Sequence, residues 1–154
     1  MNDSTKRVAI VGSGPAAFYS AMELLRHDDP MVSVDMLERL PTPYGLVRGG
    51  VAPDHEKIKS VTKIFERAAG HPRFRFFGNV EFGKDIQRLD LLQRYHAVIY
   101  AFGSRTDRHL NIIGETLKGS HAATEFVGWY NGHPDYRHHQ FDLTSKRVAI
   151  IFSK

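Results

Sequence analysis

The chain opens with short apolar runs that flank a helical pattern. Residues 7–11 form a continuous apolar run ending at Gly12, which is typical of a buried parallel strand. Residues 15–26 carry apolar side chains at helical spacing, and Pro30 lies where that helix is expected to have ended. Residues 33–38 form a second strand. The pattern therefore predicts a right-handed β-α-β unit of roughly 30 residues with parallel strands.

A long loop separates this unit from the rest of the chain. Residues 39–53 contain three prolines and three glycines, and loops of this length are usually functional or disordered. Apolar residues such as Leu46 and Val47 favour an ordered loop. Asp54 is placed to cap a helix over residues 54–70. The other predicted elements are short strands over 73–77 and 80–82, a buried strand over 95–101, a helix over 124–130 and a polar linker over 136–146.

One apolar strand pattern occurs twice. The segment Lys6–Val11, K-R-V-A-I-V, recurs at residues 146–151 as K-R-V-A-I-I. The first copy leads into a glycine-rich turn, whereas the second leads into Phe152, Ser153 and Lys154. This repeated pattern predicts a protein with two successive nucleotide-binding sites that is truncated within the first strand of the second site. The alternative is coincidence, because short strands converge on Val, Ala and Ile.

The turn after the first strand carries the candidate chemistry. Residues 12–17, G-S-G-P-A-A, fit G-x-G-x-x-[G/A], in which the glycines permit a tight turn and the approach of a pyrophosphate to the backbone. Free N–H groups at the start of the helix would face that anion. Glu38 ends the next strand, where an acid accepts ribose hydroxyls and repels a 2′-phosphate. The site thus favours FAD or NAD over NADP, unless Gly12, Gly14 and Glu38 are ordinary turn and surface residues.

Composition excludes several functions. The 154 residues suit one domain, and no apolar run approaches the roughly 20 residues of a membrane span. Cysteine is absent, which excludes disulfides, thiolate metal sites and a cysteine nucleophile. The net charge of +4 is scattered, which is atypical of a nucleic-acid surface. The short polar N-terminus predicts no targeting peptide and a cytoplasmic location. His133, His138 and His139 lie near Asp135, but a solvated linker explains them better than a metal site.

The loop from residue 41 to 55 carries the choice between FAD and NAD. Its sequence, P-T-P-Y-G-L-V-R-G-G-V-A-P-D-H, resembles a segment of adrenodoxin reductase and of its bacterial relatives, the FAD-dependent ferredoxin–NADP reductases. The sequence is closer to that of the actinobacterial members of this family than to that of the mitochondrial members. The likeness continues through residues 76–80, 100–103, 108–115 and 126–134 and covers almost the whole chain up to residue 151.

The resemblance implies an α/β fold: a Rossmann-like FAD-binding domain of the glutathione-reductase and adrenodoxin-reductase type, incomplete at its C-terminal end. It implies that residues 1–105 are the N-terminal part of this domain, 106–145 a connecting segment and 146–154 the start of a truncated NADP-binding domain. The implied FAD-binding residues are Gly12, Ser13, Gly14, Pro15, Ala16, Ala17, Glu38, Arg39, Gly45, Leu46, Phe82, Ala101 and Gly103. His55 matches a family histidine near the flavin, although a role at the start of the following helix is equally open.

The resemblance also implies an activity, that of an oxidoreductase passing electrons from NADPH through FAD to ferredoxin or a similar iron–sulfur protein. Two departures qualify it. Ile113 replaces a usual proline, and Phe152, Ser153 and Lys154 stand where the family has the NADP turn G-x-G-N-V-A. NADP(H) is therefore expected to bind only the full-length parent, and the activity of this chain alone is in doubt. The alternatives are a non-catalytic FAD-binding fragment and, less favoured, an NAD-binding protein with a single site.

Overall fold

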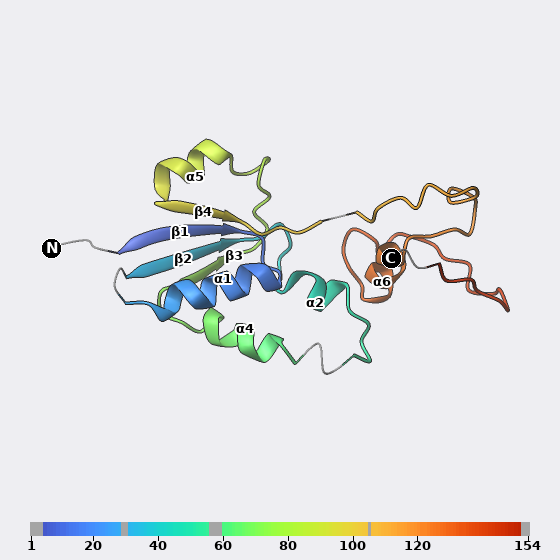
Figure 1. The fold of residues 1–154 in the computed structure, drawn as a ribbon, viewed down its shortest axis with the longest axis horizontal. Coiled ribbons are helices and arrows are strands. Elements are labelled where there is room, and N and C mark those ends of the chain that lie inside the picture. Colours follow the sequence, from blue (N-terminus) through green and yellow to red (C-terminus); the bar gives the residue numbers. More distant parts are fainter. Residues whose placement is uncertain (1–4, 29–30, 56–59, 105, 152–154) are drawn as a thin grey trace.

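A four-stranded parallel sheet organises the first two thirds of the chain. The computed structural model describes residues 5–28, 31–55, 60–104 and 106–151. The strands run in the order β3-β2-β1-β4, and helices cover both faces of the sheet (Figure 1). The strands are β1 Lys6–Val11, β2 Val32–Leu37, β3 Phe74–Phe77 and β4 Ala97–Tyr100. The helices are α1 Pro15–Arg26, α2 Gly45–Gly49, α4 Thr62–Ala69, α5 Arg88–Arg94 and α6 Ala123–Tyr130.

The predicted β-α-β unit is confirmed. Strand β1 pairs in parallel with β2, with Val8 opposite Val34 and Ile10 opposite Met36. On its other side β1 pairs in parallel with β4. Because β1 is central and covered on both faces, its last four residues are all buried, which explains the continuous apolar run in its sequence. The α/β class and the parallel topology match the expected Rossmann-like fold.

Two apolar layers flank the sheet. On one face, α1 and α4 pack through Phe18 and Phe65, whose rings are stacked with centroids 4.9 Å apart. Both side chains are fully buried, so this aromatic pair forms the centre of the larger core. On the other face, Leu91 of α5 packs against Ala9 and Val11 of β1. Successive side chains of β1 thus point alternately into the two cores on opposite faces of the sheet.

Several predicted boundaries are wrong. The helix expected over residues 54–70 is described from Thr62 onwards, and Asp54 lies in a turn instead of capping it. The segment 56–59 falls outside the described residues. Residues 80–82 form no strand, only an isolated bridge between Phe82 and Ile86. The pattern also missed α2, inside the proline-rich loop, and α5.

The chain beyond β4 extends away from the sheet to α6 (Figure 1). This helix confirms the prediction for residues 124–130. The rings of Phe126, Trp129 and Phe141 cluster beside it, with centroids 5.1–5.8 Å apart. The repeated sequence pattern predicted a strand at residues 146–151, but this strand is not formed. The segment has no regular structure, and Val148 is 82% exposed. Residues 146–151 therefore pair with no strand among the described residues.

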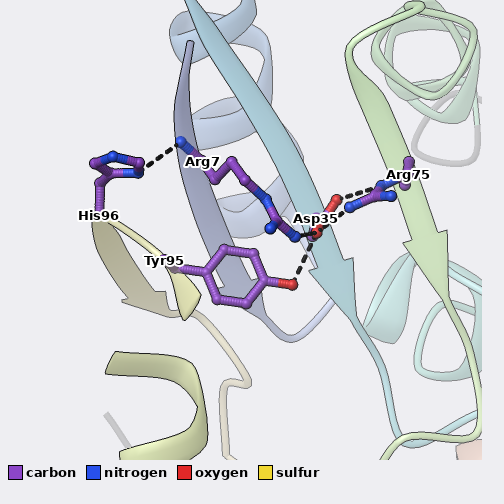
Figure 2. A network of polar contacts seen from close by, with 5 residues as sticks. All are labelled: Arg7, Asp35, Arg75, Tyr95 and His96. Atoms are coloured by element: carbon purple, nitrogen blue, oxygen red, sulfur yellow. Dashed lines mark hydrogen bonds and ion pairs between the residues drawn. The ribbon is translucent and has the colours of Figure 1, made fainter. Parts of the chain in front are cut away.

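A buried carboxylate joins the strands on the α5 face of the sheet (Figure 2). Asp35 of β2 is 3% exposed and accepts hydrogen bonds from Arg75 Nε and Nη2 at 2.7 and 2.6 Å. Tyr95 Oη donates to Asp35 Oδ2 at 2.8 Å, and Arg7 Nη2 donates to the same oxygen at 3.3 Å. His96 Nδ1 in turn accepts a hydrogen bond from the backbone N–H of Arg7 at 3.0 Å. The carboxylate thereby links β1, β2, β3 and the start of β4.

These partners determine the charge state of the network. Burial alone would raise the pKa of Asp35, but the hydrogen bonds from Arg75, Tyr95 and Arg7 and the charge of Arg75 outweigh it and lower that pKa. Burial, followed by the contact with Asp35, raises the pKa of the Tyr95 phenol. Asp35 is therefore ionised and Tyr95 is a neutral donor at neutral pH.

Candidate functional site

The glycine-rich turn lies where β1 meets α1. Gly12 adopts a φ of +105°, which glycine tolerates and other residues rarely adopt. Its N–H donates to the Leu37 carbonyl at 2.8 Å, so the turn is tied to the end of β2. A Cβ atom at Gly12 would lie 2.4 Å from the Ala101 carbonyl oxygen, directly after β4. Three strand ends therefore converge on this turn, as expected for a ligand site at the carboxyl edge of a parallel sheet.

The start of α1 has the features of an anion-binding site. The N-cap residue is Gly14, which has no side chain to cap the first N–H groups, and Pro15 occupies the first turn of the helix. A Cβ atom added at Gly14 would meet nothing within 4 Å, so open space lies over the turn. The first N–H groups of a helix lack intrahelical partners and carry the positive end of its dipole. This end of α1 is therefore free to receive a phosphate group.

Glu38 is fixed beside the same turn. Ser13 Oγ donates to Glu38 Oε2 at 2.6 Å, and the Leu40 N–H donates to Glu38 Oε1 at 3.0 Å. Ser13 is 1% exposed, so its hydroxyl is held against the carboxylate and does not face solvent. Each carboxylate oxygen can accept a further hydrogen bond. Glu38 thus combines a fixed orientation with spare acceptor capacity, and Ser13 acts as a positioning residue.

The loop after β2 folds back over the turn. The Tyr44 N–H donates to the Ser13 carbonyl at 3.0 Å, and Tyr44 has a left-handed φ of 88°. Helix α2 begins immediately afterwards at Gly45, whose Cβ, if present, would lie 3.0 Å from Gly14 Cα. Leu46 is 62% exposed on this helix. The structure therefore brings the predicted residue Gly45 to the predicted phosphate turn, and Leu46 follows it as an exposed residue of α2.

The remaining predicted contacts lie around the end of β4. The Ala101 N–H donates to the Val11 carbonyl at 2.8 Å, beside the glycine turn. The Phe82 ring meets the Tyr100 ring edge-on at a centroid distance of 5.2 Å. Gly103 has a φ of +67° and is exposed where the chain leaves the sheet. These positions share the carboxyl edge of the sheet with Glu38 and the turn.

His55 is the predicted residue that the structure does not connect to this site. Its side chain is 62% exposed, and its Nδ1 lies 3.6 Å from Asp54 Oδ1. No hydrogen bond or ion pair among the described residues joins His55 to the glycine turn. The alternative role at the start of the following helix also stays a prediction, because residues 56–59, directly after His55, lie outside the described residues. The role of His55 near a flavin stays a prediction.

The segment after α6 was missed as a neighbour of the site. Arg39, next to Glu38, forms a bidentate ion pair with Asp135, and the Asn131 amide donates to the Gly49 carbonyl at 3.3 Å. Together with residues 40–43 and Arg48, this segment lines a small cavity of about 180 Å³. The sequence offered only a compositional hint, a polar segment with several histidines and aromatic residues, and no local pattern pointed to the contact.

Metal-ligand clusters and membrane-spanning helices are two further features for which the described residues can be compared with the sequence. The described residues contain no group of three or more His, Cys, Asp or Glu side chains arranged to hold a metal ion. His133 instead accepts a hydrogen bond at Nδ1 from the Asp135 N–H at 3.2 Å. In that same part of the chain, no helix has the length and apolar character needed to cross a bilayer.

Known proteins resemble the chain over almost its whole length. NADPH-ferredoxin reductase FprA of Mycobacterium leprae is 57% identical over 148 residues, which cover 94% of this chain and 32% of that protein. The mitochondrial NADPH:adrenodoxin oxidoreductase of Arabidopsis thaliana is 48% identical over 147 residues, covering 96% of this chain and 30% of that protein. No protein-family model matches the chain.

The structural comparison agrees with the sequence comparison. The structure of Mycobacterium tuberculosis FprA in complex with NADPH matches with a TM-score of 0.82 and 58% identity, covering 87% of this chain and 30% of that one. The chain spans about a third of the length of the relatives it matches. It is homologous to the N-terminal portion of these reductases, which confirms the resemblance seen in the loop of residues 41–55.

Proposed function

We propose that this chain, as a homologue of the N-terminal portion of the NADPH-ferredoxin reductases, is an FAD-binding unit of such an oxidoreductase. The observation that carries the proposal is the fixed carboxylate of Glu38 beside the open N-terminus of α1. A phosphate-binding helix end and a ribose-binding acid on adjacent parallel strands are the parts that an adenine dinucleotide requires. The convergence of β1, β2 and the end of β4 at this edge supports the same assignment.

The residues present fit the cofactor. The open space at Gly14 admits the pyrophosphate close to the backbone, and Glu38 would accept hydrogen bonds from the ribose hydroxyls of the adenosine half. Gly45 and Leu46 of α2, which fold over the turn, would line the flavin side. When bound, FAD supplies the redox centre that accepts hydride from NADPH and releases single electrons to an iron–sulfur protein. This chain would bind and orient that centre.

The complete electron transfer is proposed for a protein of the relatives' length. In such a parent, NADPH would be the electron donor and a ferredoxin-like iron–sulfur protein the acceptor. The described residues contain one glycine-rich strand–turn–helix site, and the segment 146–151 is exposed and irregular. This observation favours a second candidate function for the chain by itself, that of an FAD-binding module without NADPH-dependent turnover.

Replacing Gly14 with alanine tests the proposed site directly. Gly14 has a φ of −77°, which alanine adopts freely, and the new Cβ would touch no protein atom. We expect little change in folding, with a cost below about 1 kcal/mol at the N-cap. The Cβ would occupy the space of the pyrophosphate, so we expect FAD affinity to fall by about one to two orders of magnitude through lost charge-assisted hydrogen bonds. Titration of the apoprotein with FAD, followed by flavin fluorescence, measures this.

Gly70→Ala provides the matched control. Gly70 also has a negative φ, and a Cβ there would make only ordinary contacts at the end of α4, away from the turn. FAD affinity should be unchanged in this variant. Equal affinity in Gly14→Ala and the unmodified protein would show that no pyrophosphate approaches this turn, and the proposed function would be rejected.

A second variant tests the ribose contact. In Glu38→Gln the side chain keeps its shape but loses its charge and one acceptor oxygen, so it can no longer serve Ser13, Leu40 and a ribose equally. A charge-assisted hydrogen bond contributes about 1.5–3 kcal/mol, which predicts a 10- to 100-fold weaker FAD complex. Calorimetric titration gives the dissociation constant. Glu23→Gln, an exposed change on α1, should bind like the unmodified protein, and an unaffected constant for Glu38→Gln would exclude the ribose contact.

A further inference from the structure

Arg39 directly follows Glu38, the proposed ribose-binding acid. In the structure its guanidinium is paired with Asp135. Its Nη1 donates to Asp135 Oδ1 at 2.9 Å and its Nη2 to Asp135 Oδ2 at 2.7 Å. This fork-to-fork geometry uses the two guanidinium nitrogens best suited to bind a phosphate or a carboxylate. Only 25% of the Arg39 side chain is exposed. Asp135 comes from a segment 96 residues further along the chain.

The turn that carries Asp135 is itself well defined. The His133 N–H donates to the Gly128 carbonyl at 2.8 Å at the end of α6, and the Tyr136 N–H donates to the His133 carbonyl at 3.0 Å. The Asp135 N–H donates to His133 Nδ1 at 3.2 Å, so the backbone of Asp135 is held within this turn. The position of Asp135 is thus a property of the turn and does not depend on Arg39 alone.

The surroundings of Arg39 are dominated by carboxylates. The hydrogen bond to Asp135 is the main cause of the raised pKa of Arg39, and the charges of Asp135, Glu81 and Glu38 add to it. Besides Asp135, the charges of Glu38 and Glu81 thus add to the negative potential around this guanidinium. A dianionic phosphate in this place would meet repulsion and no available guanidinium fork.

In dinucleotide sites, the acid at the end of the second strand selects a ribose with a free 2′-hydroxyl, whereas a nearby arginine accommodates a 2′-phosphate. This chain has both residue types side by side, at positions 38 and 39. We propose that Asp135 is a specificity-determining residue, which keeps the site selective for adenine nucleotides with a free 2′-hydroxyl by withholding Arg39 from a 2′-phosphate. The inference rests on the proposed nucleotide site and extends it to a residue outside the strand–turn–helix unit.

The test compares two probes, ADP and its 2′-phosphorylated form, 2′-phospho-ADP, in calorimetric titrations of the 154-residue protein. The unmodified protein should bind ADP more tightly. In Asp135→Asn, Arg39 loses its ionic partner and keeps at most one hydrogen bond, to the amide oxygen, so it can turn to a 2′-phosphate. We expect the ratio of the two dissociation constants to shift by about 10-fold or more towards 2′-phospho-ADP. Because 43% of the Asp135 side chain is exposed, this partly exposed ion pair contributes about 1 kcal/mol or less to folding, so the variant should keep its circular dichroism spectrum and melt at a similar temperature.

Two further variants separate the causes. The double variant Arg39→Gln/Asp135→Asn should lose the gain, because the cation that binds the phosphate is gone. Asp142→Asn, which removes a carboxylate whose hydrogen bonds among the described residues go to Thr144, should leave the ratio unchanged. The same ratio in Asp135→Asn and the unmodified protein, or a gain that survives in the double variant, would overturn the inference while leaving ADP binding intact. Failure of the unmodified protein to bind ADP would instead overturn the proposed function itself.

Discussion

Replacing Asp35 with alanine is expected to lower the free energy of unfolding by about 3 kcal/mol, at the low end of the 3–5 kcal/mol typical of a broken buried ion pair. The change removes the acceptor shared by Arg7, Arg75 and Tyr95 and leaves the Tyr95 hydroxyl without its partner in a packed interface. The cost stays at the low end because the side chains of Arg7 and Arg75 are 46% and 58% exposed and can regain water. Urea denaturation at pH 7, followed by circular dichroism, measures it.

Asp28→Ala is the matched control, since Asp28 pairs with Arg73 but its side chain is 84% exposed. That variant should lose less than about 1 kcal/mol. The pH dependence gives a second measurement. The pKa of Asp35 is lower in the folded than in the unfolded protein, so its contribution is complete above pH ~4 and disappears as the pH falls through the folded-state value. The difference between the unmodified protein and Asp35→Asn should therefore shrink in acid, and a constant difference would contradict the network.

Gly12→Ala is expected to destabilise the fold strongly. Alanine at a φ of +105° costs about 1–3 kcal/mol. Its Cβ would also lie 2.4 Å from the Ala101 carbonyl oxygen and 2.7 Å from Phe102 Cα, and relieving this overlap costs about another 1–3 kcal/mol because both atoms belong to the backbone. The sum of about 2–6 kcal/mol is a large part of the roughly 5–15 kcal/mol that stabilise a native domain. Thermal unfolding of the purified variant would show it.

Gly14→Ala, two residues along the same turn, is the internal control for this result. Its φ is negative and its Cβ meets open space, so it should fold and lose only the cofactor. The two glycines therefore predict opposite phenotypes, one in stability and one in binding. A Gly12→Ala protein as stable as Gly14→Ala would show that the end of β4 does not approach the turn as closely as the structure has it.

The sequence predicted those parts of the molecule that depend on local pattern. The apolar run of β1, the helical spacing of α1 and the acid after β2 are contiguous signals, and the turn that they define forms as expected. The short helix α2 was not predicted, because prolines and glycines dominate its loop and it is held by a contact of Tyr44 with Ser13 that no local pattern encodes. Gly45 and Leu46 were predicted as cofactor-binding residues from the resemblance and not from periodicity.

Other features depend on residues far apart in the sequence. The sequence around Asp35 does not identify the partners of this acid, because only the fold brings Arg75 and Tyr95 to it. The pairing of Arg39 with Asp135 is invisible for the same reason. Residues 146–151 show the converse case: they repeat the composition of β1, but a strand also needs a neighbour for its N–H and C=O groups, which the described part of the chain does not supply.

The network around Asp35 has a consequence for the order in which the chain assembles. Its partners lie 28, 40 and 60 residues from Asp35 in sequence, and β1 must pair with β4, where Val8 meets Ala97. Contacts between distant residues form slowly because long loops must close first. On the ribosome, β1, α1 and β2 emerge before Arg75 and Tyr95 emerge, so Asp35 remains hydrated and the nascent sheet stays open on that side. Vectorial synthesis thus delays burial of this carboxylate until β3 and Tyr95 have emerged.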